Sequence, residues 1–228
     1  MDAIQLKILT KLTTSGDGSR YMRLKPEEIE SDKFNYHLKY LIGKGLVDKK
    51  DNLYGLTVEG RKYISNLDAL GNVRETFKVS VALYAVKDNQ ILLQKRLRHP
   101  FFGDITSVAG KVLPGEKVEE AASRKLLEET GLRAKFKLIG INRKIRKDKD
   151  GEILEDTFYH ICLTQNPTGE LVAKNIFGEN FWATLEEALD YESKNVDTGV
   201  HDLEIINRIK SKNYQWFYFQ SEATLLRY

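Results

Sequence analysis

Cysteine is nearly absent from this chain of 228 residues, because Cys162 is the single one. One cysteine forms neither an intramolecular disulfide nor a cysteine-rich zinc site, which favours a reducing compartment. Long apolar runs are also missing, since no stretch approaches roughly 18 uncharged apolar residues. The first residues lack the basic start and apolar core of a signal peptide. The sequence therefore predicts a cytoplasmic protein that neither crosses a membrane nor is secreted.

An excess of either charge is lacking as well. The chain has 36 Lys and Arg against 33 Asp and Glu, a net charge of +3, which is too small to indicate a nucleic-acid-binding protein by itself. The 41% of hydrophobic and 30% of charged residues are typical of a globular protein. Any contact with DNA must therefore use a local face.

The length suits two domains better than one. The stretch 66–76 contains Gly71-Asn72 and is the best candidate for a linker. We therefore expect a small domain over residues 1–70 and a larger one over residues 71–228.

Apolar spacing and turn residues in the first part predict helices over 2–13, 26–30 and from Asp32 to Gly45, strands over 46–50 and 53–57, and a helix over 58–69. Ser31 is expected to cap the third helix. Phe34, Leu38, Leu41 and Ile42 fall on one face of it, which we expect to point inward.

The segment from Phe34 to Val47, followed by Tyr54 to Gly60, resembles the recognition helix and wing of winged helix-turn-helix regulators. The resemblance covers roughly residues 1–68, with an unusually short second helix. It implies a third helix that enters the major groove of double-stranded DNA, in a protein that we expect to be a homodimer. The candidate DNA contacts are Lys33, Asn35, Tyr36 and Lys39 on the helix, and Lys49 and Lys50 on the wing. The alternative is a domain that only dimerises or docks on protein.

Strands and helices are mixed in the second part. Strands are expected at 79–86 and 91–94, helices at 117–130, 184–192 and 198–211, and further apolar runs lie near 136–142, 157–164 and 171–173. This mixture predicts an α/β sandwich.

The segment Gly110–Leu132 carries the chemistry. A loop with glycine and proline runs into a helix that Gly131 is expected to cap. Glu128 and Glu129 share a helix face, so they concentrate negative charge where a hard cation such as Mg²⁺ could bind. The alternative from the residues alone is a solvated acidic face of a surface helix.

This segment resembles the Nudix box, G-x5-E-x7-R-E-U-x-E-E-x-G-U with U an aliphatic residue. Eight of its nine defined positions match here: Gly110, Glu116, Arg124, Leu126, Glu128, Glu129, Gly131 and Leu132. The resemblance covers about residues 76–212. It implies a Nudix α/β/α sandwich with a mixed sheet, and hydrolysis, with Mg²⁺ or Mn²⁺, of the pyrophosphate bond in a nucleoside diphosphate linked to a group X.

The resemblance also implies roles for these residues. Glu128 and Glu129 would bind the metal together with the carbonyl of Gly110, and Arg124 and Glu116 would hold the loop against the helix. The ninth position departs from the family, since Lys125 stands where a glutamate binds metal or acts as base. A protonated lysine repels a divalent ion and cannot act as a base.

Two functions follow from this departure. The first is a Nudix pyrophosphohydrolase weakened by Lys125 and fused to a DNA-binding domain. The alternative is a transcription regulator that senses a nucleotide-type metabolite without hydrolysing it. Phe101 and Phe102, in the loop before the box, could stack on a base or pack in the core. The aromatic residues at 214–219 are expected to be buried against the sandwich or a second subunit.

Overall fold

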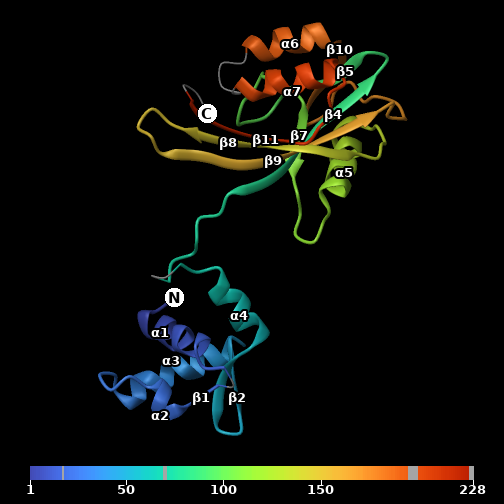
Figure 1. Cartoon of the computed structure of the whole chain (residues 1–228). Helices are drawn as coiled ribbons and strands as arrows, with labels where there is room; N and C mark the ends of the chain where they lie inside the picture. The colour runs from blue at the N-terminus through green and yellow to red at the C-terminus, as the bar shows by residue number, and fades with distance from the viewer. Residues whose placement is uncertain (17, 69–70, 195–199, 226–228) are drawn as a thin grey trace. The chain divides into compact units, whose positions relative to one another are not determined.

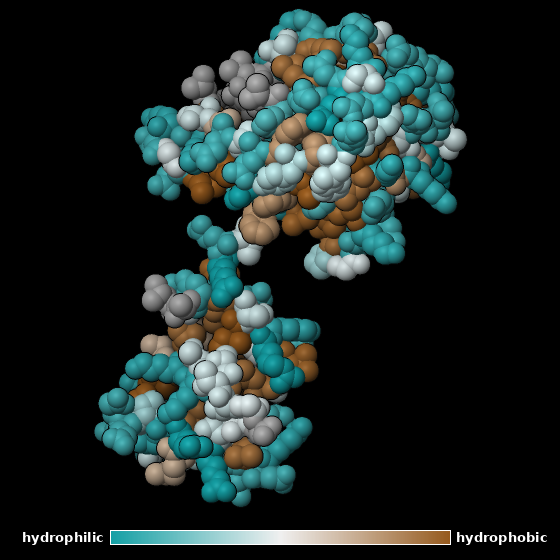
Figure 2. Space-filling view, viewed as in Figure 1, coloured by the Kyte–Doolittle hydropathy of each residue, from teal (hydrophilic) through white to brown (hydrophobic). Residues whose placement is uncertain are grey.

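The structure is a computed structural model that describes residues 1–16, 18–68, 71–194 and 200–225. The chain divides into two compact units, Met1–Thr76 and Phe77–Tyr228. Hydrophilic residues cover much of the visible face of each unit and alternate with apolar areas (Figure 2). Among the described residues, no helix combines the length and apolar character that crossing a membrane requires.

The N-terminal unit consists of short helices around a small antiparallel sheet (Figure 1). Its elements are α1 (Ala3–Thr13), β1 (Ser19–Arg20), α2 (Tyr21–Leu24), α3 (Ser31–Gly43), β2 (Val47–Lys50), β3 (Leu53–Leu56) and α4 (Val58–Ser65), with the strand order β1-β3-β2. Asp51 and Asn52 both have positive φ, 46° and 64°, which is the two-residue turn that a twisted hairpin favours. The core lies between α1, α3 and the sheet and includes Ile8, Leu9 and Phe34.

Several sequence expectations for this unit were wrong in detail. The second helix lies at 21–24, while 26–30 forms turns, because Pro26 keeps Lys25 extended (ψ 121°) and ends the helix before it. Ser31 is the first residue of α3, and the N-cap is Glu30, without a side-chain cap. Ile42 is 37% exposed. Its expected inward place is taken by His37, which is buried and hydrogen-bonded to Gln5 at 3.3 Å.

The C-terminal unit is a mixed sheet between helices (Figure 1). Its strands are β4 (Lys78–Lys87), β5 (Gln90–Arg96), β6 (Ile105–Thr106), β7 (Val108–Lys111), β8 (Lys137–Lys147), β9 (Ile153–Gln165), β10 (Gly178–Thr184) and β11 (Phe217–Thr224). The main order is β10-β5-β4-β9-β8-β11, with β6 paired to β5 and β7 paired to β4. The pairs β4–β9 and β8–β11 are parallel and the others antiparallel.

The three helices α5 (Val118–Thr130), α6 (Leu185–Lys194) and α7 (Val200–Lys210) cover the two faces of this sheet. Side chains alternate along β4. Val81 and Leu83 pack in the core that contains Leu126 of α5, whereas Tyr84 packs in the core that contains Ile205 of α7. The α/β sandwich with a mixed sheet is therefore confirmed.

Two further apolar stretches of the sequence have different places in the structure. Residues 171–173 lie outside the sheet, and the strand in this region is β10. The aromatic segment after Tyr214 contributes β11, which joins the sheet edge. Phe217 is buried over Gly140, where any side chain would collide with its ring. Trp216 and Tyr218 stay 59% and 53% exposed, so the segment is buried on one side only.

Candidate functional site

The loop between β7 and α5 is held by an ion pair. Arg124 donates from Nε to Glu116 Oε1 and from Nη2 to Glu116 Oε2, both at 2.7 Å, and Nη2 also reaches the carbonyl of Lys111 at 3.1 Å. The backbone N–H of Leu113 donates to the same carboxylate. These hydrogen bonds lower the pKa of Glu116 from its ordinary value to about 2. The structure thus joins two of the residues that the box pattern singled out.

Lys125 lies against both carboxylates of the helix. Its ammonium is 2.7 Å from Glu129 Oε1 and 3.1 Å from Glu128 Oε2. The side chain is 12% exposed and runs across Gly110, where a Cβ would collide with it. Glu128 also accepts from Arg124 at 3.2 Å. Burial alone would raise the pKa of Glu128, but the hydrogen bonds from Lys125 and Arg124 lower it.

Glu129 is the most enclosed of these groups, with 1% of its surface exposed. Besides Lys125, its carboxylate contacts Arg98 Nη2 at 3.5 Å and Gln94 Nε2 at 3.3 Å. Its backbone carbonyl accepts from Asn175 and Asn180 at 2.6 and 2.7 Å. A buried carboxylate needs such partners, because an unpaired charge is costly away from water.

This arrangement does not fit a divalent cation. Glu128 and Glu129 are neighbours on α5, but the ammonium of Lys125 contacts both carboxylates and its side chain runs across Gly110. Within the described part of the chain, no three His, Cys, Asp or Glu side chains cluster in a way that could hold a metal ion. A hard cation prefers several free oxygen ligands, and here the oxygens face positive charge.

An open groove of about 580 Å³ runs along this site. We call it the cationic groove, because six of its lining side chains are basic: Lys78, Arg96, Arg98, Lys111, Arg124 and Lys125. The one carboxylate in its lining, Glu155, is paired with Arg146 at 2.8 Å. Such a surface attracts anions, and phosphate above all.

Phe101 and Phe102 are separated by the structure. Phe101 lines the cationic groove, lies 4.8 Å from the Arg146 guanidinium, and has a left-handed backbone with φ 67°. A non-glycine residue in that conformation is a feature of many functional loops. Phe102 is 54% exposed and stacks on His99, outside the linings of the groove and of the cavity described next.

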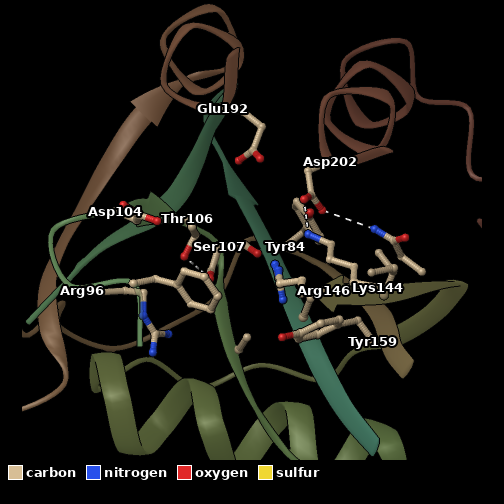
Figure 3. A pocket seen from close by; sticks show the side chains of 15 residues that line it. Tyr84, Arg96, Asp104, Thr106, Ser107, Lys144, Arg146, Tyr159, Glu192 and Asp202 are labelled. Carbon is tan, nitrogen blue, oxygen red and sulfur yellow. Dashed lines mark hydrogen bonds and ion pairs between the residues drawn. The ribbon is translucent and has the colours of Figure 1, made fainter. Parts of the chain in front are cut away.

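A smaller inner cavity of about 80 Å³ adjoins the groove (Figure 3). The two share Arg96, Phe101, Ala109 and Tyr159 as walls. Figure 3 shows Glu192 of α6 and Asp202 of α7 on the side opposite the sheet residues Tyr84, Lys144 and Arg146. The inner cavity therefore lies between the sheet and these helices.

The polar groups of the inner cavity are of both signs. Asp202 forms an ion pair with Lys144 and accepts from Asn142 Nδ2 at 3.4 Å. Asn142 Oδ1 and Arg146 Nε are buried without a hydrogen-bond partner among the described residues. Burial, and then the carboxylates of Asp202 and Glu192, raise the pKa of Tyr84 well above its ordinary value. Buried polar atoms without partners are rare in proteins, so the cavity offers free donors and acceptors.

The DNA-contact candidates lie in the N-terminal unit. Lys33, Tyr36 and Lys39 are exposed on the outer face of α3, and Asn35 is half-buried. Lys49 and Lys50 are exposed on β2, where Lys49 lies over the ring of Tyr54.

Sequence reasoning missed the groups that come from distant parts of the chain. Gln94, Arg96 and Arg98 lie on or just after β5, and Asn142 and Asp202 lie on β8 and α7. Only a charged or polar residue inside an apolar strand pattern could have indicated them, as with Gln94 and Asn142. Such a pattern does not indicate which residue the polar side chain contacts.

Known proteins resemble this chain in sequence and in fold. The family model described as the NUDIX domain matches residues 76–221. An ADP-ribose pyrophosphatase of Methanocaldococcus jannaschii is 35% identical over 112 residues, which are 46% of this chain and 66% of that enzyme. The chain thus spans just under two thirds of this relative.

Solved structures share the fold of the C-terminal unit. A MutT protein from Bacillus halodurans is 21% identical with a TM-score of 0.55, and the match covers 65% of this chain and 91% of that one. The NUDIX domain of Shewanella oneidensis NrtR, solved in complex with ADP ribose, is 17% identical with a TM-score of 0.50, covering 67% and 97%.

Proposed function

The chain belongs to the Nudix family, and we propose that it is a sensor of a nucleotide-type metabolite, fused to a DNA-binding winged helix, rather than an efficient hydrolase. One observation carries this proposal: the ammonium of Lys125 lies 2.7 Å from Glu129 and 3.1 Å from Glu128. Nudix hydrolases typically use a divalent metal such as Mg²⁺. A fixed positive charge against the two carboxylates opposes metal binding and provides no base.

The residues around the cationic groove suit the binding of a ligand better than they suit metal-dependent hydrolysis. The Arg124–Glu116 pair orders the loop beside the cationic groove, and the groove can attract a diphosphate. We propose ADP-ribose as the first ligand to test. The name of the pyrophosphatase relative and the complex of the NrtR domain with ADP ribose support this choice.

The inner cavity suits the sugar end of such a ligand. At roughly 10–15 Å³ for each water, its 80 Å³ corresponds to about five to eight water positions, the scale of a pentose. Asn142 Oδ1 can accept from a hydroxyl group and Arg146 Nε can donate to one. The lining has as many carboxylates (Asp104, Glu192 and Asp202) as basic side chains (Arg96, Lys144 and Arg146), so this cavity lacks the excess of positive charge that favours a phosphate.

The N-terminal unit is proposed to bind double-stranded DNA as part of a homodimer. Its order of elements and the exposed polar face of α3 support this proposal. Lys33, Asn35, Tyr36 and Lys39 would face the major groove, and Lys49 and Lys50 the backbone beside it. Ligand binding in one unit would then change the DNA affinity of the other.

Two assays on the full chain test the proposal. Product analysis with Mg²⁺ or Mn²⁺ is run on ADP-ribose, sugar nucleotides, dinucleoside polyphosphates and nucleoside triphosphates. Retention of genomic DNA fragments is measured with and without ADP-ribose. We expect little or no turnover and a DNA affinity that ADP-ribose shifts.

Turnover at ordinary enzyme rates of about 1–10³ s⁻¹ would instead support a hydrolase that tolerates Lys125. The Arg124–Glu116 pair favours this second function, because it keeps the loop of the box in place. Absence of salt-sensitive retention of any duplex would remove the DNA-binding part of the proposal.

A further inference from the structure

The cationic groove lacks a metal site among its described residues but retains an excess of positive charge. We propose that it binds the diphosphate of its ligand directly and without a divalent metal, with Lys125 and Arg98 as the central cations. This inference rests on the proposed function and adds the way in which the ligand is held. It departs from what the family resemblance implies, which is a metal bound by Glu128 and Glu129.

Counting charges supports the proposal. The six basic side chains that line the groove, together with Arg146 behind it, give seven positive charges. The carboxylates that contact them are Glu116, Glu128, Glu129 and Glu155, and the charge of the buried Asp104 also acts on Arg96, which gives five negative charges. The difference, seven minus five, leaves +2. A diphosphate that links two groups carries two negative charges, so the groove can neutralise it without a metal ion.

The two central cations are held in position before any ligand arrives. Lys125 and Arg98 both contact the buried carboxylate of Glu129, at 2.7 and 3.5 Å. Both also lie over the ring of Phe177, at 5.3 and 4.7 Å from its centre. Cations fixed in this way lose little conformational freedom on binding, which favours affinity. The fork of an arginine also matches the oxygens of a phosphate.

Arg96 lies beside Arg98 in the same groove. Burial lowers the pKa of Arg96, and repulsion from Arg98 lowers it further. Two guanidinium groups that repel each other at the wall of an open groove gain from an anion that contacts both. Lys78 and Lys111, both exposed at the rim, extend the positive surface. The groove is therefore built for an anion with several oxygens.

Isothermal titration of the full chain tests this inference. ADP-ribose, ADP and AMP are titrated in buffer with EDTA and again with Mg²⁺. For ADP-ribose, and likewise for ADP, we expect the Kd in EDTA to equal the Kd in Mg²⁺ within about twofold. AMP should bind at least tenfold more weakly than ADP, because it lacks the diphosphate. The Kd should rise steeply with salt concentration.

Two variants and a control identify the cations. Arg98→Gln and Lys125→Gln should each weaken ADP binding in EDTA by about tenfold, because each removes a charged hydrogen bond. Arg98 is 45% exposed, so its variant is the safer of the two for folding. Lys174→Gln is the matched control, since Lys174 is 66% exposed and pairs with Glu179 outside the groove. Its Kd should stay at the wild-type value.

Three results would overturn the inference: binding that needs Mg²⁺, no saturable binding in either buffer, or unchanged Kd values in both groove variants. The same samples are assayed for hydrolysis, which separates the two proposals. Metal-dependent binding without turnover contradicts the inference and leaves the sensor function standing. Metal-free binding together with rapid Mg²⁺-dependent turnover contradicts the sensor function and leaves the inference standing.

Discussion

Substituting Lys125→Glu should create a metal site. The substitution restores the ninth position of the Nudix box and makes the local charge two units more negative. Without a metal, Glu129 loses its nearest cation while it stays buried with 1% of its surface exposed. A third carboxylate is also added beside Glu128. We therefore expect the variant to be less stable than the wild type in EDTA.

The magnitude follows from burial and geometry. Removing one partner of a buried ion pair costs about 3–5 kcal/mol, and the lower end applies because Arg98 remains 3.5 Å from Glu129. A loss of about 3 kcal/mol lowers the Tm of a unit of this size by roughly 6–12 °C. A divalent ion at a free concentration of about a hundred times its Kd stabilises the folded variant by about 2.7 kcal/mol. This stabilisation raises the Tm by roughly 5–11 °C.

Thermal unfolding followed by circular dichroism, in EDTA and with Mn²⁺, measures these shifts. We expect a large Mn²⁺-dependent rise in Tm for Lys125→Glu and almost none for the wild type. Lys125→Gln is the control, because it removes the ammonium without adding a ligand. A wild-type Tm that rises with Mn²⁺ as much as that of Lys125→Glu would refute the reasoning that Lys125 displaces the metal.

Three further outcomes are expected. Glu116→Gln should lower the free energy of unfolding by about 1–3 kcal/mol at neutral pH, because the charged hydrogen bonds to Arg124 are removed. Because the pKa of Glu116 is about 2, the difference from wild type in urea unfolding should shrink as the pH falls from 4.5 toward 2; a constant difference would contradict the pairing. Replacing Lys33 and Lys39 by alanine should weaken DNA binding and reduce the salt slope by about one for each phosphate that the protein no longer neutralises, as measured by fluorescence anisotropy. Asn142→Leu should weaken ADP-ribose binding about fivefold, because one hydrogen bond is removed, and leave ADP binding unchanged; equal effects on both ligands would place the sugar elsewhere.

Much of the fold could be predicted from local patterns. The hairpin of the N-terminal unit follows from Asp51-Asn52, and α5 ends at Gly131 because only a left-handed residue, here with φ 76°, closes the helix there. The edge strand β11 could not be predicted in this way. Its pairing with β8 joins residues about 77 positions apart, such as Phe217 and Gly140, and no local pattern specifies such a register.

The candidate site, like the fold, has one part that local sequence patterns predict and one part that depends on distant segments. The box pattern names Glu116, Arg124, Glu128 and Glu129 because they lie within one loop and one helix, where spacing fixes proximity. What these carboxylates do depends on groups from elsewhere.

Arg98 reaches Glu129 from 31 residues away, after a strand that only the sheet brings beside α5. Without Arg98, Lys125 alone would leave the pair Glu128 and Glu129 with one negative charge in excess, enough to keep some attraction for a cation. With Arg98 and Arg124 also in contact, and with Glu116 paired to Arg124, three positive charges face three negative ones. The negative excess of the box is thus removed by tertiary structure, and the other basic side chains of the groove add positive charge beside it. This change is the physical reason why a sequence that matches eight of nine positions of a metal-binding motif can favour an anion at the same place.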